Sequence, residues 1–181
     1  MDIITEISGI DSKSRRSAKK AAVEIIRQGS FLYDMIFDKA IGTSGVTAER
    51  CAESCARAAV LQPGLTKNKS KPLVRAILAN PKGNMRYSLS AILIHTKVSK
   101  NDAEKCSAVI KKWLDEEEGR GARACFLETI YALSYASKKI KPLAEELVSE
   151  ALKSPITSYS ARARQIVMRT AKETSKSKSN N

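Results

Sequence analysis

The sequence has few aromatic residues and no long apolar run. Phe, Trp and Tyr make up 5% of its 181 residues, whereas alanine, leucine, isoleucine, serine and lysine are plentiful. Because aromatic residues are enriched in strands, this composition favours helices packed through small side chains over an aromatic-rich β core. No segment approaches the roughly 20 consecutive apolar residues that a membrane span requires. We therefore expect an all-α protein that has no membrane as its partner.

Cysteine and histidine are also scarce, with four cysteines and one histidine. The first residues, MDIITEISGIDSKSRR, carry acids early and lack the apolar core of a secretion signal. Without a secretory context the cysteines are expected to be reduced thiols, which predicts an intracellular, cytoplasmic protein, or a nuclear one in a eukaryote. His95 and Cys51, Cys55, Cys106 and Cys125 lack the spacing of a zinc site and are expected to pack in the core.

Motifs of catalysis are missing as well. The chain has no glycine-rich phosphate loop, no nucleophile elbow and no HExxH sequence. We therefore predict no catalytic, metal-binding or cofactor-binding residue, and the sequence favours a protein that is not an enzyme.

Positive charge is the most uneven feature of the chain. The formal net charge is +13, and residues 67–100 contain eight Lys and Arg but no Asp or Glu. Residues 155–181 add six cations against Glu173. Such an array suits contact with a phosphate backbone. A solvated face with a basic tail would give the same distribution of charge along the sequence. The predicted nucleic-acid-binding residues are Lys67, Lys69, Lys71, Arg75, Lys82, Arg86, Lys97, Lys100, Arg162, Arg164 and Arg169.

Turn residues divide the chain into segments with helical spacing of apolar residues. The expected helices cover 13–28, 31–41, 46–60, 72–79, 85–98, 102–116, 121–137, 141–153 and 158–172, and no segment reads as a strand. Trp113 is expected to anchor a helix pair. The polar end of the chain, 173–181, has nothing to bury and is expected to be disordered.

Several of these segments repeat. The stretches NPKGNMRYSLSAIL, EEEGRGARACFLETI and SPITSYSARARQIV each run from a turn through an arginine into an apolar helix, and GTSGVTAERCAESCARAA is a weaker copy. Aligned on Arg50, Arg86, Arg123 and Arg162, they are spaced by 36, 37 and 39 residues. This pattern resembles the HEAT-repeat family, whose units are antiparallel helix pairs with an arginine near the start of the second helix.

The resemblance covers roughly residues 30–170 as four units and implies a right-handed α-solenoid with a capping helix at 13–28. It predicts a segment 1–12, one HEAT-like domain over 13–172 and a tail over 173–181. In this arrangement each repeated arginine is expected to orient its turn, with its stem packed and its head at a rim. The turns carry Asn80, Ser154 and a glutamate run at 116–118 where the family often has Asp.

Three functions follow from this sequence. The first is a binding module that contacts the phosphate backbone of DNA or RNA without reading base sequence. The second is a scaffold that holds a helix or an acidic peptide in the solenoid groove. The third is a DNA glycosylase, since the chain is similar in helix pairing and charge to the alkylpurine glycosylase D family. Trp113 and Asp115 lie two residues apart, however, and would not share a helix face.

Overall fold

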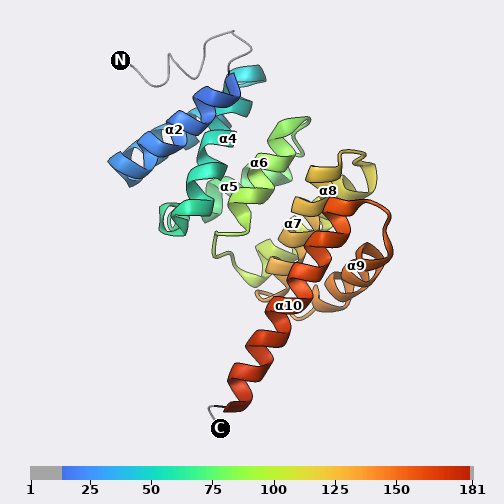
Figure 1. Cartoon of the computed structure of the whole chain (residues 1–181). Helices are drawn as coiled ribbons and strands as arrows, with labels where there is room; N and C mark the ends of the chain where they lie inside the picture. The colour runs from blue at the N-terminus through green and yellow to red at the C-terminus, as the bar shows by residue number, and fades with distance from the viewer. Residues whose placement is uncertain (1–13, 180–181) are drawn as a thin grey trace. The chain divides into compact units, whose positions relative to one another are not determined.

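The computed structural model describes residues 14–179, and these residues form helices and turns without any strand. The α-helices are α2 (Ser14–Gln28), α3 (Ser30–Gly42), α4 (Gly45–Leu61), α5 (Ser70–Leu78), α6 (Asn84–Leu93), α7 (Lys100–Glu116), α8 (Arg120–Ser134), α9 (Lys141–Lys153) and α10 (Thr157–Ser179). A short 3₁₀ helix, η1 (Pro63–Thr66), precedes α5 (Figure 1). The all-α class predicted from the sequence is therefore confirmed.

The chain divides into two compact units, of which unit 1 ends at Val98 and unit 2 begins at Ser99. Unit 1 contains α2 to α6, and unit 2 contains α7 to α10. The sequence predicted one HEAT-like domain over 13–172, and each unit is described by itself below. The predicted segment 1–12 lies outside the described residues.

Helix α4 is the centre of unit 1 and packs against α2, α3 and α6. Its buried positions are mostly small, and Ala52, Cys55 and Ala59 are completely covered. Small side chains allow neighbouring helices to approach α4 on several sides at once. The larger core residues come from α3, where Tyr33 and Phe37 stack with ring centroids 6.1 Å apart. The core of unit 1 therefore combines small residues of α4 with aromatic residues of α3.

Helix α8 has the corresponding place in unit 2, where it packs against α7, α9 and α10. Trp113 of α7 lies against Phe126 of α8, with ring centroids 5.9 Å apart and both side chains fully buried. The predicted role of Trp113 as an anchor between two helices is confirmed. Helix α7 starts at Lys100 because Ser99 caps it, accepting a hydrogen bond from the Asp102 amide at 3.2 Å.

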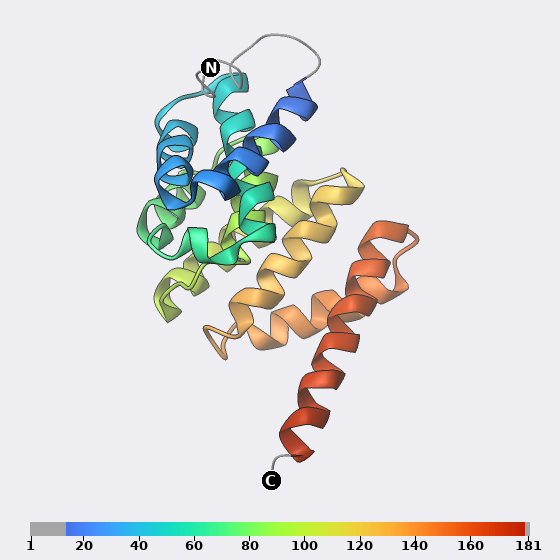
Figure 2. The same ribbon diagram turned by 60° about the vertical axis from the view of Figure 1, so that its left-hand side comes forward.

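The helix ends that differ most from the sequence prediction are those of α6 and α10, and α8 also stops at Ser134 where we expected 137. Helix α6 stops at Leu93, whereas we expected it to reach 98. After it, the Thr96 hydroxyl donates to the Ile92 carbonyl at 2.9 Å in a short turn that leads to the Ser99 cap. Helix α10 continues to Ser179, past the predicted end at 172, because no proline or glycine interrupts it. Figures 1 and 2 both show its last turns extending beyond α9.

Among the described residues, no helix is both long enough and apolar enough to cross a bilayer.

Candidate nucleic-acid interface

Five of the predicted nucleic-acid-binding residues lie exposed in unit 1 and form what we call the basic segment. These are Lys67, Lys71, Arg75, Lys82 and Lys97. Lys67 follows η1, Lys71 and Arg75 belong to α5, Lys82 lies in the turn before α6, and Lys97 lies in the turn after α6. None of the five forms a salt bridge with a carboxylate within residues 14–179. Within the described residues, no carboxylate is therefore paired with their charges.

Helix α5 places two of these cations on one face. Lys71 and Arg75 are four residues apart, and so they lie one above the other on the exposed side of the helix. Leu73, Val74 and Ile77 occupy the buried side. The amphipathic spacing of this short helix thus fixes the direction in which its cations point.

Lys69 does not belong to this exposed set, although we predicted that it would bind nucleic acid. It is only 8% exposed, and its ammonium group lies 2.9 Å from Asp34 and 3.7 Å from Asp38 of α3. The same nitrogen lies 5.5 Å from the centre of the Phe37 ring. Lys69 therefore joins the start of α5 to α3, and we assign it to the packing of unit 1.

Arg86 lies in the first turn of α6, where we expected it to orient the preceding turn. Its Nε donates to the Pro81 carbonyl at 2.8 Å, and its guanidinium also reaches the Asn80 side chain at 3.5 Å. Asn80 has a φ of 53°, and the Arg86 contacts hold the turn around that left-handed residue. The side chain is half-buried, so it contributes less to an exposed surface than the five cations of the basic segment.

Arg123 repeats this arrangement at the start of α8. Its guanidinium donates to the carbonyls of Leu114 and Glu117 at 3.0 and 2.8 Å, and it lies 5.1 Å from the centre of the Tyr159 ring. The expectation that the repeated arginines orient their turns is therefore confirmed for Arg86 and Arg123.

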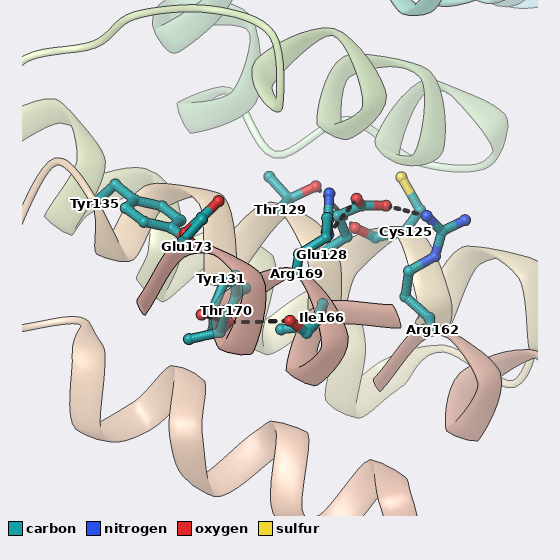
Figure 3. Close-up of polar contacts among 10 residues, drawn as sticks. All are labelled: Cys125, Glu128, Thr129, Tyr131, Tyr135, Arg162, Ile166, Arg169, Thr170 and Glu173. Atoms are coloured by element: carbon teal, nitrogen blue, oxygen red, sulfur yellow. Dashed lines mark hydrogen bonds and ion pairs between the residues drawn. The ribbon is translucent and has the colours of Figure 1, made fainter. Parts of the chain in front are cut away.

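The remaining predicted cations lie in unit 2. Lys100 is the exposed first residue of α7, and Arg164 is exposed on α10. Arg162 and Arg169 of α10 both pair with Glu128 of α8, whose side chain is 12% exposed (Figure 3). One carboxylate thus binds two guanidinium groups, which leaves a single net charge at this position. The two arginines lie together, and the shared carboxylate of Glu128 offsets one of their two positive charges.

Two tyrosines extend the same α8–α10 contact. The Tyr131 hydroxyl lies 2.6 Å from the Thr170 hydroxyl, and the Tyr135 hydroxyl donates to Glu173 at 3.1 Å (Figure 3). The two rings meet edge to face, with centroids 5.7 Å apart. Burial and the hydrogen bonds with Tyr131 and Glu173 raise the pKa of Tyr135. The Glu173 contact joins this part of α10 to α8. We had expected residues 173–181 to form a disordered tail.

Sequence reasoning missed an apolar groove in unit 1, which encloses about 400 Å³. Its small residues are alanines of α2, α4 and α6, and its larger residues include Val60 and Leu61, which are 58% and 69% exposed. The complete lining, which we call the unit 1 groove, is Lys19, Ala22, Val23, Glu53, Ala56, Arg57, Val60, Leu61, Tyr87 and Ala91. The sequence shows that Val23, Val60 and Leu61 are apolar. It does not show that three helices bring apolar residues together in one groove.

The four cysteines are buried and form no disulfide. Burial raises the pKa of the Cys51 and Cys106 thiols to about 11 and that of Cys125 to about 12. Such thiols are protonated at neutral pH and are poor nucleophiles and poor metal ligands. Within residues 14–179, no group of three His, Cys, Asp or Glu side chains is placed to hold a metal ion. His95 is half-buried, and its carbonyl accepts a hydrogen bond from Thr66 at 2.7 Å.

Comparison of the chain with protein-family models, curated proteins and solved structures finds no match.

Proposed function

We propose that the protein is a non-enzymatic module that binds the phosphate backbone of nucleic acid through the basic segment of unit 1. The observation that carries this proposal is the exposure of all five cations in a stretch, 67–97, that contains no carboxylate. Lysine and arginine contacts of this kind release counterions from the nucleic acid, and they need no base-specific geometry. Few aromatic side chains or amides accompany them, and so sequence-independent binding is the expected mode.

We also propose that each unit is built from stacked HEAT-like helix pairs, as in an α-solenoid. The supporting contacts are those of α3 with α4, α5 with α6, α7 with α8 and α9 with α10. Second helices of successive pairs also pack together, α4 on α6 and α8 on α10. In this arrangement the basic segment belongs to one helix pair, α5 and α6, and to the turns on either side of it.

The two alternative functions differ in their support. The unit 1 groove favours a scaffold that holds a helix, since exposed apolar residues of this kind often mark interaction sites. That mode should retain an affinity that salt does not abolish, because apolar contacts are not screened. A glycosylase is disfavoured, because Trp113 is fully buried whereas Asp115 is exposed and pairs with Lys111 at 2.7 Å.

Binding to 20-mer duplex DNA, single-stranded DNA and RNA across a salt series tests the proposal. If all five cations contact phosphates, the logarithm of the association constant should fall with the logarithm of salt with a slope of about −4.5 on duplex DNA. Raising salt from 50 to 200 mM would then weaken binding roughly 500-fold. The test variant is Lys71→Glu, Arg75→Glu, Lys82→Glu, which reverses three of the five charges.

A matched control separates a specific surface from net charge. Lys105, Lys138 and Lys153 are exposed lysines of unit 2, and replacing all three by glutamate changes the net charge by the same amount. We expect the control to bind at least tenfold more tightly than the test variant. Equal loss in both proteins would show that net charge alone is responsible, and no binding of the wild type at 50 mM salt would refute the proposal.

A further inference from the structure

Unit 2 contains a cavity of about 220 Å³, which we call the unit 2 pocket and which is lined by side chains of α8, α9 and α10. Its aromatic residues are Tyr131 and Tyr135, and its acidic residues are Glu145 and Glu173. Ala144 of α9 also lines it and is small enough for a ligand to approach the helix backbone. The pocket thus combines aromatic and acidic side chains in a chain whose net charge is +13.

The two tyrosines provide aromatic walls that stand at a right angle. They are four residues apart on α8, and their rings meet at 83° with centroids 5.7 Å apart. Tyr131 is half-buried, whereas Tyr135 is 66% exposed, so the ring of Tyr135 is accessible to a ligand. Aromatic rings attract a cation through the negative charge on their faces. Two rings in this arrangement therefore favour a positively charged ligand.

Glu173 gives the pocket its net negative charge. Its carboxylate accepts a hydrogen bond from the Tyr135 hydroxyl at 3.1 Å, but it forms no salt bridge with any side chain that the structure describes (Figure 3). A neutral hydroxyl does not cancel the charge of the carboxylate. Glu145 lies 3.7 Å from Lys141, which also lines the pocket, and these two exposed side chains offset each other. The charge of Glu173 is therefore the one that remains for a ligand.

The other groups of the pocket narrow the class of ligand. The hydroxyls of Tyr131, Ser134 and Tyr135 already take part in hydrogen bonds within the protein, which disfavours a sugar or another polyol. Among the residues that the structure describes, no three His, Cys, Asp or Glu side chains are placed to hold a metal ion. The volume corresponds to roughly seven molecules of liquid water, which suits a small organic group.

We propose that the unit 2 pocket binds a small organic cation that carries a methylated ammonium group. The ammonium group lies against the rings of Tyr131 and Tyr135, and Glu173 supplies the opposite charge. Methyl groups suit this site because they contact the rings while the positive charge is spread over their surface. The pocket belongs to unit 2 alone, and so this proposal does not depend on the binding of nucleic acid by the basic segment of unit 1.

Titration of the whole chain with choline, followed by NMR of the tyrosine rings and the Ala144 methyl group, tests the proposal. Choline is compared with the uncharged alcohol in which carbon replaces the quaternary nitrogen, and sodium chloride keeps the ionic strength constant. We expect choline to saturate the shifts of Tyr131, Tyr135 and Ala144 in the millimolar range, and the alcohol to bind at least about fivefold more weakly. Equal affinities for the two compounds, or no shift with choline, would overturn the proposal.

Variants at two positions separate the charge, the ring and the hydrogen bond. Glu173→Gln removes the charge but can still accept the hydrogen bond from Tyr135, and it should weaken choline binding about fivefold. Tyr135→Leu removes the ring and should weaken binding about two- to fivefold. Tyr135→Phe loses only the hydrogen bond and should bind nearly as the wild type does. Unchanged binding in Tyr135→Leu would overturn the proposal, because the ring would then have no part in the site.

Glu146→Gln is the matched control for Glu173→Gln. Glu146 is an exposed residue of α9 outside the pocket lining, and its replacement changes the net charge by the same amount. We expect this variant to bind choline as the wild type does. Equal losses of affinity in Glu146→Gln and Glu173→Gln would overturn the proposal, since net charge alone would then explain the binding.

Discussion

Replacing Lys69 should destabilise unit 1 while leaving the binding of nucleic acid almost unchanged. The neighbouring Lys71 should behave in the opposite way. The two residues are close in sequence and have the same charge, but Lys69 is buried against Asp34, Asp38 and Phe37, whereas Lys71 is exposed. The pair therefore tests whether burial distinguishes cations that hold the fold from cations that are available to a ligand.

The size of the effect follows from the contacts of Lys69. A hydrogen bond between charged groups contributes about 1.5–3 kcal/mol, but the side chain of Asp34 is 46% exposed, and so we use the lower end. The contact with the Phe37 ring contributes about 0.5–1 kcal/mol. Lys69→Ala should thus lower the free energy of unfolding by about 2 kcal/mol, and Lys69→Met, which keeps most of the apolar stem, by less. Lys71→Ala should change it by no more than about 0.5 kcal/mol.

Urea unfolding followed by circular dichroism measures these differences. With a typical urea dependence, a loss of about 2 kcal/mol lowers the midpoint by roughly 1 M. Anisotropy of labelled duplex DNA then gives the salt slope, which Lys71→Ala should reduce by about 1 and Lys69→Ala should preserve. If Lys69→Ala unfolds like the wild type and loses salt dependence as Lys71→Ala does, the assignment of Lys69 to packing is refuted.

Three further predictions concern unit 2. Arg123→Met removes two hydrogen bonds to carbonyls and should lower the urea midpoint of Trp113 fluorescence by an amount equivalent to about 1–3 kcal/mol, whereas Arg120→Met should not. Glu128→Gln should release its two arginine partners and steepen the salt slope of duplex binding by up to about 2; an unchanged slope would place them outside the interface. Burial holds the pKa of Cys125 near 12, so above pH 8.5 only the unfolded thiol ionises, and stability should fall as pH rises to 10 by up to about 1.4 kcal/mol per unit. In Cys125→Val this fall should be smaller, as measured by urea unfolding at pH 8 and pH 10.

The helices were predictable because their signals are local. Apolar spacing and turn residues identified each α-helix of the described chain. The start of α7 was expected at 102, whereas the Ser99 cap places it at Lys100. The end of α10 was not predictable from composition. A polar, lysine-rich stretch lacks an apolar face, yet Glu173 bonds to Tyr135 of another helix, and that partner is far away in the sequence.

The candidate interface was predictable only in part, because a cation can have partners that lie far away in the sequence. An acid-free stretch indicated where cations gather, and five of them are exposed as expected. The stretch contains no carboxylate that could pair with Lys69, and so nothing local distinguished it from Lys67 or Lys71. Its partners are Asp34 and Asp38, about 30 residues earlier, and only the folding of unit 1 brings them near.

The cations that hold the structure and those that remain available differ in chemistry as well as in position. The planar guanidinium groups of Arg86 and Arg123 donate to the oxygens of a turn, a geometry that a lysine ammonium does not reproduce. Four of the five cations in the basic segment are exposed lysines. The net charge of +13 therefore overstates the number of cations that the proposed interface could use. The salt slope, which counts only the contacts that displace counterions, is the quantity that measures it.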